Sequence, residues 1–380
     1  MHRRQRRERT MFLMILALAG IVFATGFSPV VVTPGDAAAW AVSREYLSGL
    51  RQPQVPEVTA AGYILVNPTT GQIVLAHEEH ARLAPASLTK IMTFMAATSM
   101  VSSASEGKLS LRTQMQTIKA DYYPYSAIGM GEGDFFTLEE MLYILLVPSD
   151  NAAAVTIARS LAGSEQAFVG QMNALAAEWG LVNTRFVNAH GLDAGGQYSS
   201  PYDLAILSRA AMSNTLFADI VRHVQVDKGG YRLTSTNELL SAYPGAVGIK
   251  TGTTDEAGQC LVGWVQRPAG TVLAVVMASQ DRIADSTALL DYFYDNELEL
   301  VLDLPRSALN RYRDGHGNLH EFTIAEPVVF LVHPWELGSL RYVRRLWQLP
   351  EEPSAEEQLG MLEVWLNGRL LTEMPLYVRP

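Results

Sequence analysis

Segments with the length and composition of β-strands lie at both ends of the stretch from Val58 to Asn296, and helix-like segments lie between them. Gly62–Val66 and Ile73–Ala76 are apolar runs on either side of a turn-forming segment, a pattern that predicts a hairpin. Later strand-like runs are Val247–Lys250, Cys260–Val265 and Val272–Met277. Helical spacing or start signals occur at Ile91–Ala97, Thr137–Leu146 and Pro201–Arg209. This order predicts a mixed domain, residues 58–296, in which helices pack on a mixed sheet.

The chain changes character after Asn296. Short β-like runs follow, such as Phe322–Ile324 and Pro327–Val332. Asn367-Gly368 stands between two further apolar runs, and Asn-Gly is the strongest short hairpin signal because both turn positions need φ > 0. Residues 297–380 are therefore predicted to form a small β-rich domain.

The first residues indicate export. Residues 2–9 hold five arginines, and residues 11–27 are apolar and uncharged, a run that extends to residue 32 if a serine and a proline are allowed. A basic segment followed by an apolar segment is typical of a secretory signal or an N-terminal anchor. Residues 1–39 are interpreted as a signal peptide cleaved near Ala39 or as an anchor retained through residues 11–32. Residues 40–57, which contain two prolines, are interpreted as a linker, and the remainder is expected at the extracytoplasmic face of the membrane or in the periplasm.

Composition excludes several classes of protein. The 29 Lys and Arg against 39 Asp and Glu give a net charge of −10, and the sequence contains no long basic block, so nucleic acid is not an expected partner. The single cysteine, Cys260, excludes an internal disulfide framework and a cysteine-based zinc cluster. We expect Cys260 to be a small buried side chain in a strand.

The first chemical motif is Ser87-Leu-Thr-Lys90. Positions i and i+3 share one face of a helix, so the lysine amine can approach the serine hydroxyl. A serine is a weak nucleophile without a base, and a lysine among apolar groups can lose its proton near neutral pH. Ser105-Glu-Gly-Lys108 has the same spacing, but it lies in a polar stretch with no apolar helix after it, and is interpreted as a solvated loop.

Two further motifs follow in the chain. Ser149-Asp-Asn151 offers a second hydroxyl and an amide that can hold a carbonyl, although a helix N-cap would also explain it. Lys250, Thr251, Gly252 and Thr253 lie on a predicted strand, where the glycine would let a substrate backbone approach; a strand end with a turn is the alternative. Average residue frequencies give the ordered trio by chance in roughly one chain in a thousand.

The trio is the signature of class A β-lactamases and penicillin-binding proteins. From Val58 to the C-terminus the chain resembles the low-molecular-mass penicillin-binding proteins, which are serine D-alanyl-D-alanine carboxypeptidases of peptidase family S11. Four segments carry the resemblance: Asn67–Gly71, Pro85–Lys90, Asn188–Leu192 and Gly248–Thr254. The resemblance implies an α+β, β-lactamase/transpeptidase-like domain, with an antiparallel sheet packed by helices, followed by the small all-β domain.

The resemblance also implies roles. Ser87 would form the acyl-enzyme, Lys90 would accept its proton, and Ser149 would pass a proton to the departing D-alanine. Asn151, Lys250, Thr251, Gly252 and Thr253 would bind the substrate, with Thr251 and Thr253 near its terminal carboxylate. Backbone N–H groups of Ser87 and Thr253 would form the oxyanion hole. The implied partners are peptidoglycan stem peptides and, as covalent inhibitors, β-lactams; no metal or cofactor is implied. Any membrane attachment would rest on residues 11–32.

Other interpretations stay open at this point. A β-lactamase needs a glutamate for deacylation, and none of Glu165, Glu178 and Glu238 has the sequence context of class A enzymes. A zinc peptidase would need a His-Glu-x-x-His pair, which the eight histidines do not provide. A non-enzymatic module that binds wall peptides or β-lactams is the third alternative. His190 is a candidate for a further site role or a structural histidine, and Arg282 for a site neighbour or a solvated arginine.

Overall fold

The computed structural model describes residues 54–104, 109–122, 126–302, 304, 310–347, 354 and 357–379. They form two compact units, Gln54–Glu299 and the residues from Leu300 onward, here called the large and the small unit. The expected signal or anchor segment 1–39 and most of the expected linker 40–57 lie outside the described residues. The domain limits expected from the sequence, 58–296 and 297–380, remain predictions.

A five-stranded sheet forms the centre of the large unit, with strand order β2-β1-β9-β8-β7. The strands are β1 (Gly62–Val66), β2 (Ile73–His77), β7 (Ala246–Thr254), β8 (Gly258–Arg267) and β9 (Gly270–Ser279). Every neighbouring pair is antiparallel. The sheet is therefore antiparallel throughout, as the family resemblance implies, and the mixed sheet predicted from the order of elements is wrong. Its first hairpin pairs with its last strand.

The β1–β2 hairpin is confirmed, and the cause is local. Asn67 follows β1, and its side-chain oxygen accepts hydrogen bonds from the backbone N–H of Thr69 and of Thr70, at 2.9 and 2.8 Å. Such an Asx turn reverses the chain through local hydrogen bonds. The amide nitrogen of the same side chain donates to the carbonyl oxygen of Thr271 at 3.1 Å, which ties the turn to β9.

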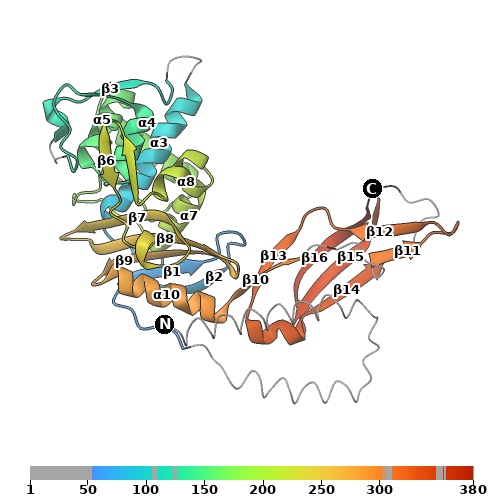
Figure 1. Ribbon diagram of the computed structural model, residues 1–380. Coiled ribbons are helices and arrows are strands. Elements are labelled where there is room, and N and C mark those ends of the chain that lie inside the picture. Colours follow the sequence, from blue (N-terminus) through green and yellow to red (C-terminus); the bar gives the residue numbers. More distant parts are fainter. Residues whose placement is uncertain are drawn as a thin grey trace. The chain divides into compact units, whose positions relative to one another are not determined.

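Helices cover both faces of this sheet. The helices of the large unit are η1 (Ala86–Leu88), α3 (Thr89–Ser103), η2 (Lys119–Tyr122), α4 (Leu138–Leu146), α5 (Asn151–Ala162), α6 (Glu165–Glu178), α7 (Pro201–Met212), α8 (Thr215–Val221), α9 (Leu239–Ala242) and α10 (Arg282–Asn296). In Figure 1, α10 lies along one face of the sheet, and α7 lies on the other with the remaining long helices beyond it. The predicted capping box at Thr137 is present at the start of α4. Two short hairpins, β3 (Gln114–Gln116) with β4 (Phe135–Thr137) and β5 (Gln225–Lys228) with β6 (Tyr231–Thr234), complete the unit.

The small unit is built from strands, as predicted. Its strands are β10 (Leu298–Leu302, which crosses from the large unit), β11 (Arg311–Arg313), β12 (Leu319–Thr323), β13 (Val328–Val332), β14 (Arg341–Leu346), β15 (Gln358–Leu366) and β16 (Arg369–Val378), with η4 (Pro334–Ser339) before β14. Five of them form a sheet in the order β11-β12-β16-β15-β14. Asn367 and Gly368 join β15 to β16 with φ of 52° and 75°, which confirms the Asn-Gly hairpin.

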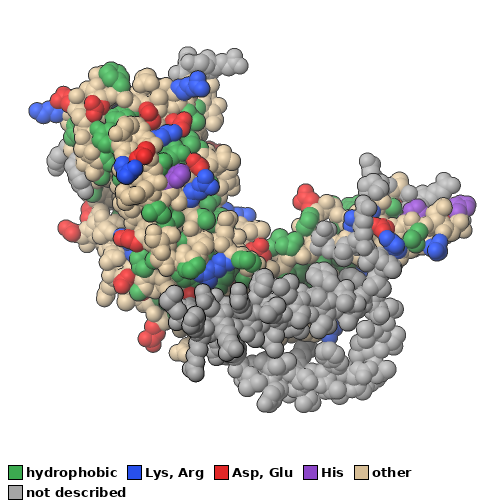
Figure 2. Space-filling view, in the orientation of Figure 1, with side chains coloured by type: hydrophobic (Ala, Val, Ile, Leu, Met, Phe, Trp, Pro, Cys, Tyr) green, Lys and Arg blue, Asp and Glu red, His purple; other side chains and the backbone are tan. Residues whose placement is uncertain are grey.

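The visible surface mixes charges of both signs. Figure 2 shows lysine and arginine side chains interspersed with aspartate and glutamate over the large unit. Within the described residues, no single helix is both long and apolar enough to cross a membrane. One pair bent by 106°, Pro201–Met212 with Thr215–Val221, meets the criteria of length and composition when taken together.

Candidate active site

Ser87 lies in η1, the short turn that leads into α3. Gly191 packs directly on this turn from a loop about a hundred residues further along the chain. A Cβ placed on Gly191 would lie 2.0 Å from the carbonyl oxygen of Ala86, and the φ of Gly191 is +92°. Only glycine fits such a position without moving its neighbours. The loop thus holds the backbone that presents the serine.

Lys90 is fully buried, and its amine lies at the centre of a hydrogen-bonded group. The Nζ atom is 2.9 Å from Ser87 Oγ, 2.6 Å from Asn151 Oδ1 and 2.7 Å from the carbonyl oxygen of His190. Burial lowers the pKa of Lys90 to about 7, although the nearby Asp150 carboxylate acts in the opposite direction. A neutral amine keeps two N–H donors for Asn151 and His190 and turns its lone pair to the serine hydroxyl.

The Ser149-Asp-Asn151 motif lies at the start of α5. Asp150 is the N-cap, with its carboxylate accepting from the backbone N–H of Ala153 at 2.8 Å, so the capping interpretation is confirmed for this residue. Asn151, the first helical residue, is the one that contacts Lys90. Ser149 has φ of +62°, a strained conformation for a residue with a side chain, and such strain often marks a functional site. Within this short motif, Asp150 caps the helix and Asn151 contacts Lys90.

Lys250 and Gly252 share one face of β7, since side chains alternate along a strand. A Cβ on Gly252 would lie 2.8 Å from the backbone nitrogen of Ser87, which places this strand directly beside Ser87. Lys250 is 1% exposed and donates to the carbonyl oxygen of Thr251 at 2.8 Å. Burial, followed by the charges of Lys90 and Arg282, holds the pKa of Lys250 well below its usual range. The motif occupies the end of β7, and a turn follows the strand, so these residues also fit the alternative of a strand end with a turn.

The two threonines of this strand have different partners. The hydroxyl of Thr251 is buried and lies 2.8 Å from that of Thr236. Thr253 is exposed, and its Oγ1 accepts from Arg282 Nη1 at 2.7 Å. Arg282 is thus a neighbour of the site, and its side chain is only 13% exposed. The structure places Thr253 where a ligand can reach it and ties Thr251 to the loop before α9.

Two of the remaining residues considered in the sequence have defined places. His190 contributes its backbone carbonyl to Lys90, and burial, with the charge of Lys90, lowers the pKa of its imidazole to about 4. Cys260 is fully buried in β8, as predicted. The second Ser-x-x-Lys sequence, Ser105–Lys108, lies outside the described residues. Sequence reasoning missed Thr236 and the backbone role of His190, since a carbonyl contact leaves no mark on residue type.

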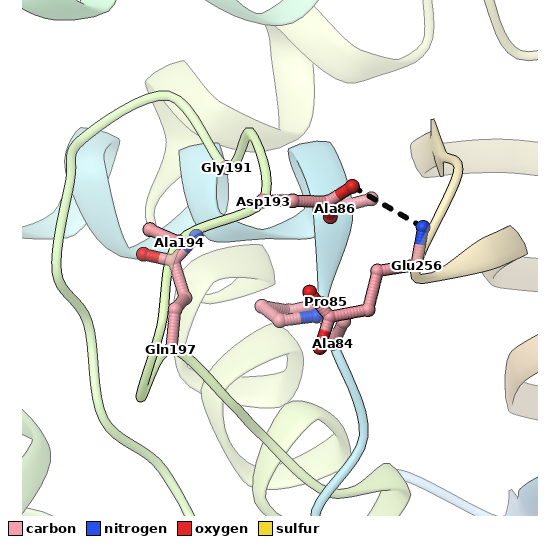
Figure 3. Close-up of a pocket in the computed structure, with 8 residues that line it drawn as sticks. All are labelled: Ala84, Pro85, Ala86, Gly191, Asp193, Ala194, Gln197 and Glu256. Atoms are coloured by element: carbon pink, nitrogen blue, oxygen red, sulfur yellow. Dashed lines mark hydrogen bonds between the residues drawn. The ribbon is translucent and has the colours of Figure 1, made fainter.

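A shallow hollow lies beside η1 (Figure 3). It is lined by Ala84, Pro85, Ala86, Gly191, Asp193, Ala194, Gln197 and Glu256. Asp193 accepts from the backbone N–H of Glu256 at 3.2 Å and from Thr254 Oγ1 at 2.5 Å, which ties the Gly191 loop to the β7–β8 turn. The hollow includes none of the site residues expected from the sequence, so we assign the chemistry to the Ser87–Lys90 cluster next to it.

We expect Gly191→Ala to lower both stability and the rate of acylation by penicillin, the latter by at least about tenfold for a displacement on the scale of 1 Å. The new methyl group would force the turn carrying Ser87 to shift. Gly163→Ala is the matched control, because Gly163 has a similar φ of +82° and nothing within 4 Å of the added Cβ. Melting temperature and acylation rate should be measured for both variants. Equal behaviour of the two would show that the contact with Ala86 does not hold the turn.

A serine hydroxyl beside a buried lysine amine of lowered pKa defines a class of protein, the serine acyl-transferring enzymes and hydrolases in which lysine replaces histidine as the base. The comparisons narrow this class. Residues 50–281 match the family model described as D-alanyl-D-alanine carboxypeptidase. The chain is 32% identical to the D-alanyl-D-alanine carboxypeptidase DacF of Bacillus subtilis, over 83% of this chain and 84% of that protein. It is 35% identical to the DacD enzyme of Escherichia coli, over 85% and 87%.

Solved structures agree with these sequences. Penicillin binding protein 6B from Escherichia coli has a TM-score of 0.68 at 26% identity, covering 86% of this chain and 97% of that one. Penicillin binding protein 5 from Haemophilus influenzae has the same TM-score at 23% identity, covering 86% and 98%, and supports the fold. The chain belongs to the D-alanyl-D-alanine carboxypeptidase family, peptidase family S11.

Proposed function

We propose that this chain is a serine-type D-Ala-D-Ala carboxypeptidase that removes the terminal D-alanine from peptidoglycan stem peptides through an acyl-enzyme on Ser87. The observation that carries the proposal is the contact of 2.9 Å between Lys90 Nζ and Ser87 Oγ. The other two contacts of that amine hold it in place, so the free electron pair of the neutral amine would face the hydroxyl proton.

In the first half of the reaction, Ser87 Oγ attacks the carbonyl carbon of the penultimate D-alanine while its proton passes to Lys90. The oxyanion would be held by the backbone N–H groups of Ser87 and Thr253, and one such donor stabilises a transition state by about 3 kcal/mol. The C–N bond then breaks, and the amine of the leaving D-alanine receives a proton through Ser149. Asn151 and Lys250 would position the peptide.

In the second half, water attacks the acyl ester and restores the Ser87 hydroxyl. A β-lactam would follow the first half only, because its amine leaving group stays attached to the acyl-enzyme through the opened ring. The guanidinium of Arg282, beside Thr253, suits ligands that end in a carboxylate, which would lie near Thr251 and Thr253. Neither Glu165 nor Glu238 is engaged with Ser87: Glu165 accepts from the N–H of Ala189, and Glu238 pairs with Arg282.

The proposed substrate lies outside the cytoplasm, so we also propose export by residues 1–39. The segment would be cleaved near Ala39 or retained as a membrane anchor through residues 11–32. The enzyme would then work at the extracytoplasmic face of the membrane or in the periplasm.

Purified residues 40–380 are expected to release one D-alanine from a diacyl-L-Lys-D-Ala-D-Ala peptide, measured by coupling to D-amino acid oxidase. The same peptide ending in L-alanine is the control and should release none. Activity should persist in a metal chelator, which distinguishes a serine mechanism from a zinc peptidase. Covalent labelling by penicillin without any D-alanine release would instead support the non-enzymatic binding module.

A further inference from the structure

The guanidinium group of Arg282, beside the proposed substrate site, already forms an ion pair with a carboxylate of the protein itself, that of Glu238. Arg282 Nη2 lies 3.0 and 3.1 Å from the two carboxylate oxygens of Glu238. The other terminal nitrogen, Nη1, contacts Thr253 Oγ1 at 2.7 Å and the carbonyl oxygen of Gly252 at 3.4 Å. This pair therefore lies directly against the strand that carries Lys250 and Gly252.

The donors of Arg282 can be counted. A guanidinium has five N–H groups, two on each Nη and one on Nε. Both Nη atoms are engaged, and Nε is buried without a hydrogen-bond partner within the part of the chain that the structure describes. A ligand carboxylate that approaches Arg282 consequently finds the Nη donors engaged and Nε buried, and must replace Glu238 to obtain a charged hydrogen bond.

The two side chains differ in freedom. Arg282 is 13% exposed and held by Thr253, whereas Glu238 is 58% exposed. An exposed carboxylate regains water contacts when it leaves an ion pair, so the cost of displacing it is modest. Glu238 is thus the exchangeable member of the pair, and Arg282 is the fixed one.

We propose that Glu238 is a specificity-determining residue that competes with the terminal carboxylate of the ligand for Arg282. This inference rests on the proposed function, in which that carboxylate lies near Thr253. Glu238 lowers the affinity of the site for every ligand with a free carboxylate and leaves neutral ligands at an advantage. It touches no reacting atom and has no part in proton transfer.

The variant Glu238→Gln tests the competition, because it removes the charge and keeps the shape. The measurement is the ratio of acylation efficiencies for benzylpenicillin and for its methyl ester, which lacks the carboxylate. We expect this ratio to rise by up to about fivefold, the upper end of the range for loss of one partly exposed charge pair. The KM for the D-Ala-D-Ala peptide should fall by a similar factor with little change in kcat.

Glu256→Gln is the matched control, since Glu256 is an exposed carboxylate on the neighbouring β7–β8 turn. An unchanged or lower ratio in Glu238→Gln would overturn the proposal, because Glu238 would then be a support for Arg282. An equal rise in Glu256→Gln would also overturn it, by showing a general effect of charge.

Equilibrium binding of both penicillins to Ser87→Ala, with and without Glu238→Gln, measures the same competition without any acylation. If wild-type protein forms no acyl-enzyme, the proposed function fails, and these binding constants still decide the role of Glu238. Tighter binding of benzylpenicillin alone in the double variant supports competition, and equal affinities contradict it.

Discussion

Labelled penicillin should form a covalent band with the wild-type protein and no band with Ser87→Ala. The hydroxyl is the atom that would bond to the lactam carbonyl, and alanine offers no replacement. Removing the serine nucleophile of a serine hydrolase lowers kcat by about six orders of magnitude. Gly191 and Gly252 lie close to the backbone nitrogen of Ser87. The substitution removes one side-chain oxygen and leaves that backbone in place, so the fold should be unchanged.

The control for this experiment is Ser105→Ala, which removes the serine of the second Ser-x-x-Lys sequence. It should label like the wild type. A band that persists in Ser87→Ala and disappears in Ser105→Ala would refute the assignment of the nucleophile. Loss of the band in both variants would indicate a folding defect, and their circular dichroism spectra would reveal it.

Lys90→Met should reduce acylation by about 10²- to 10⁴-fold, the usual contribution of a general base. Methionine has a similar unbranched chain but no lone pair that can accept the serine proton. The change also leaves Asn151 Oδ1 and the carbonyl of His190 without their donor, which is expected to cost about 1–3 kcal/mol of stability for each buried group. Acylation should therefore be measured well below the melting temperature of the variant.

The pH profile separates the role of a base from that of a packing group. Lys90 acts as a base only when neutral, and its pKa is lowered to about 7. Acylation by the wild type should rise with pH through about 7, since two pH units below the pKa only about one amine in a hundred is neutral. The residual activity of Lys90→Met should lack this rise. If the same rise remains in the variant, another group accepts the proton.

The elements that the sequence predicted correctly depend on neighbours along the chain. The turn of the β1–β2 hairpin, the capping box at Thr137 and the Asn-Gly turn at Asn367 are each built from residues within a few positions of one another. The contact of Ser87 with Lys90 is of the same kind, since the two residues are three positions apart. Local chemistry determines these features, so one sequence is enough to recognise them.

The parts that the sequence did not predict join distant segments. The carbonyl of His190 accepts a hydrogen bond from Lys90, which is a hundred residues earlier in the chain. Arg282, the first residue of α10, contacts Glu238 and Thr253. No spacing rule relates such positions, and a backbone carbonyl is available at every residue type. From the sequence alone, Arg282 could be either a neighbour of the site or a solvated surface arginine. The motifs were enough to select Ser149 and Thr253 as candidate residues. The backbone conformation of Ser149 and the hydrogen-bond partner of Thr253 depend on the folded structure.

The pairing of β1 with β9 has a consequence for the order in which the site can form during synthesis. Gly62 pairs with Met277, so the hairpin made first waits for a strand made more than two hundred residues later. A nascent chain that ends before β9 already holds Ser87, Lys90, Asn151 and Lys250, but the strand that joins β1 to β8 is absent. Contacts of such long range form slowly, because loop closure precedes the gain from pairing. Ser87 and Lys90 are thus made early, and the sheet beside them is complete only when β9 pairs with β1 and β8.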